Sequence, residues 1–121
     1  MTANRLADYL EYIQQAATDA CSFVEGLSKA EFLADKRTQQ AVVMSLIIIG
    51  EAASKLMDHY PAAIESYANV PWRNMRGMRN RIAHGYFEIN FEVVWETVCS
   101  ALPELLMQLA ELRSDVDGEE T

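Results

Sequence analysis

The amino-acid sequence predicts an all-α fold, a bundle of four main helices plus a short one. Apolar residues recur every three or four positions through most of the chain, which is the pattern of helices that bury one face. No two segments show the alternation and turn signals of a strand pair. The 121 residues, half of them apolar, suit one domain with its own core, expected to span residues 1–113. Residues 114–121 form an acidic tail without apolar periodicity, which we expect to be frayed.

Two long apolar stripes predict the first two main helices. One stripe begins at Leu6 and continues to Leu27, and the other runs from Val42 to Leu56. The apolar run 46–49 would also suit a buried strand, but the stripe continues beyond it and favours a helix. The second helix is apolar on more than one side, so it needs neighbours on both sides. A second copy of the chain is a candidate for one of these neighbours.

Prolines mark the starts of the next two helices. Pro61 occupies the favoured first-turn position of the short helix, which is expected to end near residue 67. Pro71 opens a helix that spans about 72–84, and Gly85 then stands where a left-handed C-terminal cap is expected.

The last main helix has a clear start and an interruption. Asn90 is a favourable N-cap, and an apolar stripe follows from Phe91 to Leu112. Pro103 lies inside this stripe, which predicts a kink or break near Leu102.

The overall charge limits the function. Ten basic and 18 acidic residues give a net charge of −8, which argues against a protein that coats nucleic acid or an anionic membrane. Charged residues interrupt the start of the chain where an export signal needs an apolar core, and the uncharged run 38–50 is too short to span a bilayer. We therefore expect a cytoplasmic protein with no membrane partner and no DNA partner. Cys21 and Cys99 lack metal-ligand spacing, so we expect both to be buried free thiols and expect no metal site.

One segment departs from this acidic character. Residues 66–87 carry four arginines and no acidic residue, a local charge of +4. The arginines are Arg73, Arg76, Arg79 and Arg81. They can pair with the acidic flanks in a solvated network, or they can form a site for phosphate. The absence of lysine favours phosphate, because the guanidinium group matches two phosphate oxygens at once.

The same segment contains a histidine at the expected end of its helix. Histidine transfers protons near neutral pH, and arginine stabilises the charge that builds on phosphorus during RNA cleavage. The alternative is that His84 only contacts the carbonyl groups at the helix end. Arg79 and His84 lie about 140° apart on an ideal helix, whereas Arg81 is an easier neighbour of His84. The spacing alone therefore does not choose between Arg79 and Arg81.

A single histidine leaves the reaction short of either an acid or a base. A two-fold dimer would place two copies of Arg79 and His84 across one cleft. Glu51, within the apolar second helix, either orients Arg79 from the bundle or takes an exposed position. We interpret His59 as a structural histidine, and Trp72 and Trp95 as core or interface anchors.

Residues 77–86, Gly-Met-Arg-Asn-Arg-Ile-Ala-His-Gly-Tyr, match the R-x4-H-x-Y pattern of the HepT-like toxins of the HEPN superfamily. The segments Ile49-Gly50-Glu51-Ala52, Val70-Pro71-Trp72 and Val94-Trp95 are also similar to that family, so the resemblance covers nearly the whole chain. It implies an antiparallel helical bundle that forms a homodimer. It further implies a metal-independent endoribonuclease without a cofactor, which acts on RNA in its own cell as a toxin.

The resemblance also implies roles for residues. Arg79 would bind the scissile phosphate, His84 would act as acid or base, and Asn80 would support them. Arg73, Arg76 and Arg81 stay candidates for RNA binding, with the antitoxin as the other possible partner of Arg81. In a type VII-like toxin–antitoxin module, the partner would be a minimal nucleotidyltransferase antitoxin that adds AMP to Tyr86 and so silences the nuclease.

A second hypothesis assumes the same fold but no catalytic activity. Some HEPN-type dimers are not catalytic, so the arginines would then bind a nucleotide or a nucleotidyltransferase partner without cleaving RNA. Replacement of His84 separates the two hypotheses, because a binding module keeps its affinity without the imidazole.

Overall fold

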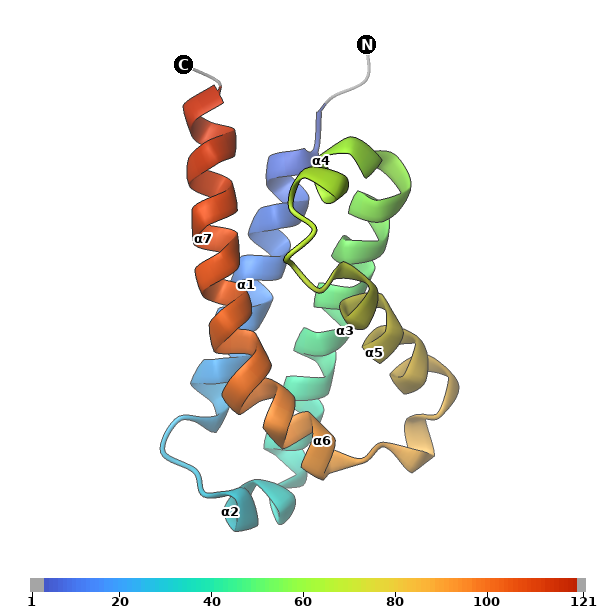
Figure 1. Cartoon of the computed structure of the whole chain (residues 1–121). Helices are drawn as coiled ribbons and strands as arrows, with labels where there is room; N and C mark the ends of the chain where they lie inside the picture. The colour runs from blue at the N-terminus through green and yellow to red at the C-terminus, as the bar shows by residue number, and fades with distance from the viewer. Residues whose placement is uncertain (1–3, 120–121) are drawn as a thin grey trace.

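The computed structural model describes residues 4–119, with side chains to residue 115, and contains no strand within these ranges. Four long helices dominate: α1 (Leu6–Val24), α3 (Lys36–His59), α5 (Trp72–His84) and α7 (Leu102–Glu119). Consecutive long helices run in opposite directions (Figure 1). α1 packs against α3 and α7, and α5 packs against the other side of α3. The all-α prediction is confirmed, and residues 46–49 are helical rather than a strand.

Three short helices join the long ones, where the sequence predicted one. They are α2 (Lys29–Leu33), α4 (Pro61–Ser66), which is the predicted one, and α6 (Phe91–Glu96). α2 begins with a capping box in which the Glu31 N–H donates to Ser28 Oγ at 3.1 Å and the Ser28 N–H donates to Glu31 Oε1 at 2.9 Å. The bond from the Ser28 N–H lowers the pKa of the Glu31 carboxyl. The Ser-x-x-Glu pattern was legible in the sequence, but α2 is too short to show an apolar stripe.

The core lies between α1, α3 and α7. Its fully buried larger side chains are Leu10, Ile13, Phe32, Val42, Leu56, Val94, Val98, Leu105 and Leu109. Phe32 anchors α2 against α6, with ring centroids 6.4 Å from Phe91 and 5.4 Å from Trp95. Trp72 is buried, and its indole N–H donates to the Tyr67 carbonyl at 3.1 Å. Both tryptophans therefore serve as packing anchors.

α3 is the central helix of the bundle. Its N-cap is Asp35, whose carboxylate accepts bonds from the Thr38 hydroxyl at 2.6 Å and the Thr38 N–H at 3.2 Å. These bonds lower the pKa of the Asp35 carboxyl. By length and composition α3 is apolar enough to cross a membrane, the one such helix in the described ranges, but 56% of its apolar window is buried by the other helices. This burial is what the core helix of a bundle requires.

The prediction for the end of α5 was wrong. Gly85 has φ −136°, so it is not a left-handed cap; its N–H donates to the Arg81 carbonyl at 2.9 Å, and a 3₁₀ turn, Tyr86–Glu88, follows. A Cβ at Gly85 would lie 3.2 Å from that carbonyl, so glycine serves the close approach rather than the dihedral angle. A left-handed glycine does follow α1, where Gly26 has φ +82°.

The last predicted helix does not break, but its hydrogen-bond pattern changes at one turn. A π-helical turn, Thr97–Ala101, joins α6 to α7, and the Leu102 N–H donates to the Thr97 carbonyl (Figure 1). Pro103 has no N–H to donate, and the wider π-helical turn just before this proline accommodates the missing hydrogen bond. α7 continues past residue 113 into the acidic segment as far as Glu119, and residues 120 and 121 lie outside the described range.

The expectation that both cysteines are buried was wrong for Cys99. Cys99 is exposed in the π-helical turn, and Cys21 is half-buried with its Sγ 3.8 Å from the Val98 carbonyl. Both thiols are free, and partial burial raises the pKa of each.

Candidate functional site

The predicted site residues are distributed around the axis of α5. Arg76 and Arg79 face α3 and contact its residues. An outer stripe at helical spacing faces solvent and consists of Arg73, Gly77, Asn80 and His84. Arg81 lies on the third side, toward α6 and α7. The helix therefore does not present its four arginines as one surface.

Gly50 sets the distance between α3 and α5. A Cβ built on Gly50 would lie 2.2 Å from Arg79 Cβ and 2.8 Å from the Met75 carbonyl oxygen. The stem of Arg79 therefore rests directly on the backbone of α3, and only a residue without a side chain permits this approach. Glycine at position 50 is thus a requirement of the site.

The next residue on α3 fixes the guanidinium group. Arg79 Nη1 donates to a Glu51 carboxylate oxygen, and Arg79 Nε donates to Asn80 Oδ1 at 2.9 Å. The Arg79 side chain is 22% exposed and that of Glu51 53%, so Glu51 both orients Arg79 and takes an exposed position. Nη2 has no partner among the described residues, which leaves donors that can reach a phosphate oxygen.

Arg76 is held one helical turn away by the same face of α3. Its Nε donates to Ser54 Oγ at 3.0 Å, and its Nη2 donates to the Ser54 carbonyl at 3.2 Å and to Asp58 at 2.8 Å. Glu51, Ser54 and Asp58 follow a spacing of three and four, so they form one stripe opposite the two arginines. We did not predict this ladder, although the spacing of the three polar residues within an apolar helix was a usable signal.

Arg79 and His84 do not meet within one chain. Arg79 lies against α3, whereas His84 is exposed at the last position of α5, and its imidazole has no hydrogen bond or ion pair in the described part of the chain. The separation expected from the helical turn is therefore maintained, because the helix stays regular up to His84.

Arg73 and Arg81 line separate cavities. Arg73 borders a cavity of about 510 Å³ between α4 and the start of α5, which also contacts Ile64 and Trp72. Arg81 borders a cavity of about 280 Å³ lined by Met78, Leu102 and other apolar side chains. Neither arginine forms an ion pair with a residue in the described ranges.

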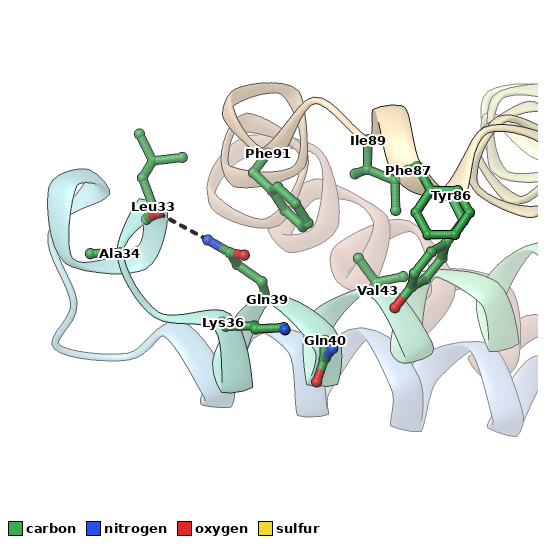
Figure 2. Close-up of a pocket in the computed structure, with 10 residues that line it drawn as sticks. All are labelled: Leu33, Ala34, Lys36, Gln39, Gln40, Val43, Tyr86, Phe87, Ile89 and Phe91. Carbon is green, nitrogen blue, oxygen red and sulfur yellow. Dashed lines mark hydrogen bonds between the residues drawn. The ribbon is translucent and has the colours of Figure 1, made fainter.

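A third cavity lies beside Tyr86, the predicted modification site. It has a volume of about 440 Å³ and separates the 3₁₀ turn from α2 and the first turns of α3 (Figure 2). Tyr86 is half exposed, and the ring of Phe87 stands edge-to-face against it with centroids 5.8 Å apart. We call this cavity, lined by Leu33, Ala34, Lys36, Gln39, Gln40, Val43, Tyr86, Phe87, Ile89 and Phe91, the Tyr86 groove.

The exposed face of α3 next to the site is apolar. Met44 is 57% exposed and Ile48 42% exposed, and both share the helix face of Glu51 at spacings of four and three. No three His, Cys, Asp or Glu side chains come together as a metal-binding group in the described ranges.

The sequence was also compared with known proteins. The family model described as "Ribonuclease HepT-like" matches residues 13–112. The chain belongs to the HepT-like ribonuclease family. The resemblance inferred from residues 77–86 is therefore confirmed at the level of the family and of the HEPN superfamily.

Relatives of this HepT-like chain come from several organisms. "Putative RNase MJ0127" of Methanocaldococcus jannaschii is 36% identical over 112 residues, which cover 93% of this chain and 90% of the relative. "Putative RNase TTE0752" of Caldanaerobacter subterraneus subsp. tengcongensis is 38% identical over 104 residues, covering 86% and 90%. "Probable ribonuclease HepT" of Thermococcus cleftensis is 36% identical over 106 residues, covering 88% and 94%. No solved structure matches the chain.

Proposed function

We propose that this HepT-like chain is a metal-independent endoribonuclease, the toxin of a type VII-like toxin–antitoxin module that acts in the cytoplasm. The observation that supports it most is the position of Arg79, clamped over Gly50 by Glu51 and Asn80 with donors left over for a phosphate. A guanidinium group held in this way can bind a phosphate without first losing rotational freedom, and it stabilises added charge on phosphorus.

In the proposed reaction, the 2′-hydroxyl of the RNA attacks the adjacent phosphorus while a base removes its proton. The bond from phosphorus to the 5′-oxygen breaks, and an acid donates a proton to that oxygen. The products are a 2′,3′-cyclic phosphate and a 5′-hydroxyl. Arg79 binds the phosphate oxygens, and His84 serves as acid or base.

The reaction needs Arg79 and His84 close together, and we propose that a homodimer supplies this. Met44 and Ile48 form an exposed apolar strip on α3 that lies next to Glu51. An exposed apolar strip beside a charged site favours burial against a second copy of the chain. A two-fold axis near this strip and the outer stripe of α5 would bring His84 of one chain toward Arg79 of the other.

We further propose that the partner is a minimal nucleotidyltransferase antitoxin and that Tyr86 is its AMP acceptor. Tyr86 is half exposed and lies two residues beyond His84, so its hydroxyl belongs to a surface that an enzyme can reach. An added phosphate there would compete with RNA for the arginines.

Cleavage of total RNA in EDTA tests the nuclease. The wild-type chain should cleave and leave 2′,3′-cyclic phosphate ends, and His84→Ala should not. His59→Ala is the matched control, because His59 is an exposed histidine at the end of α3, and it should cleave like the wild type. If the wild type leaves RNA intact while its mass shows an unmodified Tyr86, the chain is a binding module instead.

Complementation tests the shared site. Arg79→Ala and His84→Ala chains, co-expressed with different tags and purified as mixed dimers, should recover about half of the wild-type rate, because one of the two sites is complete. A site within one chain would leave the mixed dimer inactive. Sedimentation should give twice the 13.7 kDa chain mass for the wild type and for Met107→Lys on α7, and a monomer for Ile48→Lys.

A further inference from the structure

The Tyr86 groove differs chemically from the rest of this acidic protein. Of its ten lining residues none carries a carboxylate and one, Lys36, is cationic, although acidic residues outnumber basic ones by 18 to 10 in the chain. Lys36 forms no ion pair in the described ranges. It also stands in the first turn of α3, where a positive charge opposes the helix dipole, so helix stability does not explain it. The groove therefore offers an anionic or electron-rich ligand one cation and no repelling carboxylate.

Aromatic rings supply the walls of the groove. Phe87 is 99% exposed, so it makes no contribution to the core, and Tyr86 and Phe91 lie on the same side of the space (Figure 2). Aromatic rings exposed to solvent are the usual platform for stacking an unpaired base. A volume of about 440 Å³ is within the range of small-ligand sites.

Gln39 provides a fixed hydrogen-bond acceptor. Its Nε2 donates to the Phe32 carbonyl at 3.0 Å and to the Leu33 carbonyl at 3.1 Å, which uses both amide hydrogens. Figure 2 shows the amide oxygen turned away from Leu33, toward the space beneath Phe91. This oxygen has no partner among the described residues, so it is free to accept from the exocyclic amine of a base.

The groove and the proposed nuclease site lie along the same helix, α3. Val43 lies seven residues and Gln39 eleven residues before Gly50 on the same face of α3, which places the groove about 10 to 16 Å along the helix from the Arg79 contact. Two or three nucleotides of an extended strand cover the longer of these distances. His84 and Tyr86 connect the two regions through the end of α5.

We propose that the Tyr86 groove binds an unpaired nucleobase with an exocyclic amine, in an RNA strand that flanks the scissile phosphate. The base stacks on Phe87, its amine donates to Gln39, and Lys36 contacts the backbone phosphate. The strand assignment rests on the proposed nuclease function, whereas the binding of a base does not. The consequence is a preference for single-stranded RNA with adenine, cytosine or guanine, rather than uracil, next to the cut.

Fluorescence anisotropy of 2′-O-methyl oligonucleotides, which are not cleaved by the proposed route, tests the groove with the full chain at low salt. Phe87→Ala should weaken binding of an eight-residue adenine strand by about 5- to 140-fold, the range for loss of one stacked base. Phe87→Tyr should restore it. Phe23→Ala on α1, an exposed phenylalanine outside the groove, is the matched control and should bind like the wild type.

The possible outcomes distinguish the base site from the proposed nuclease, and an RNA strand from a free nucleotide. Equal affinity of the wild type and Phe87→Ala for the adenine strand overturns the groove, even if the wild type cleaves RNA. A loss on Phe87→Ala in a chain that does not cleave RNA keeps the base site and overturns the nuclease. Equal binding of adenine and uracil strands overturns the role of Gln39, and AMP that binds as tightly as the strand overturns the RNA assignment.

Discussion

Substitution of Gly50 by alanine tests whether α3 and α5 are held at their separation by a missing side chain. The new Cβ would lie 2.2 Å from Arg79 Cβ, 2.8 Å from the Met75 carbonyl oxygen and 2.9 Å from Arg79 Cγ. The carbonyl belongs to the α5 backbone and cannot rotate aside, so the two helices must separate. Overpacking of this severity costs about 3 kcal/mol, and the higher helix propensity of alanine returns about 1 kcal/mol. We expect a net loss of about 2 kcal/mol in the free energy of unfolding.

The assay is urea denaturation followed by circular dichroism, with Gly77→Ala as the matched control. Gly77 also lies inside a helix, but its Cβ would meet nothing closer than Arg81 Nη1 at 3.5 Å, so this variant should gain up to about 1 kcal/mol. Equal stabilisation of both variants would refute the close-contact argument. Gly50→Ala should also slow RNA cleavage in the variant that stays folded, because a displacement of about 1 Å at Arg79 can cost on the order of 100-fold in rate.

Two further predictions concern charges on α3. Glu51→Gln should change the free energy of unfolding by less than about 1 kcal/mol, because its ion pair with Arg79 is partly exposed, yet it should lower the RNA cleavage rate by releasing Arg79. The control is Asp58→Asn, which loosens Arg76 instead and should cleave RNA at nearly the wild-type rate. Equal cleavage rates for the wild type and both variants would contradict the orienting role of Glu51. The folded-state pKa of Asp35 is lowered, so its stabilising effect is present above the ordinary carboxyl value of about 4 and is lost as pH falls through the folded value. Urea midpoints of Asp35→Ala should therefore depend less on pH in the acidic range than those of the wild type, and parallel curves for the two chains speak against the cap.

Local signals in the sequence predicted most of the helices because each boundary depends on a few neighbouring residues. Asn90 caps α6 by accepting from the N–H groups of Glu92 and Val93, and Pro71 directly precedes α5, as expected. The apolar stripe of α3 specified a helix against the strand alternative. The misjudged end at Gly85 depended on a contact with a carbonyl one turn away, and both a left-handed cap and a close approach call for glycine.

The candidate site was likewise predicted in part from the sequence and in part only from the tertiary structure. The motif around Arg79, His84 and Tyr86 identified the family, because the identity and spacing of these residues are visible in the sequence without knowledge of the fold. The Gly50 contact, the Glu51 clamp and the separation of Arg79 from His84 depended on how α5 lies across α3. Sequence spacing fixes the angle of a side chain about its own helix axis, but burial of apolar surface from the whole chain decides which neighbour that side chain meets. The sequence by itself therefore determined the long helices, the family and the residues to examine. The tertiary structure decided that Arg79 is clamped against α3, while His84 stands free at the end of its helix.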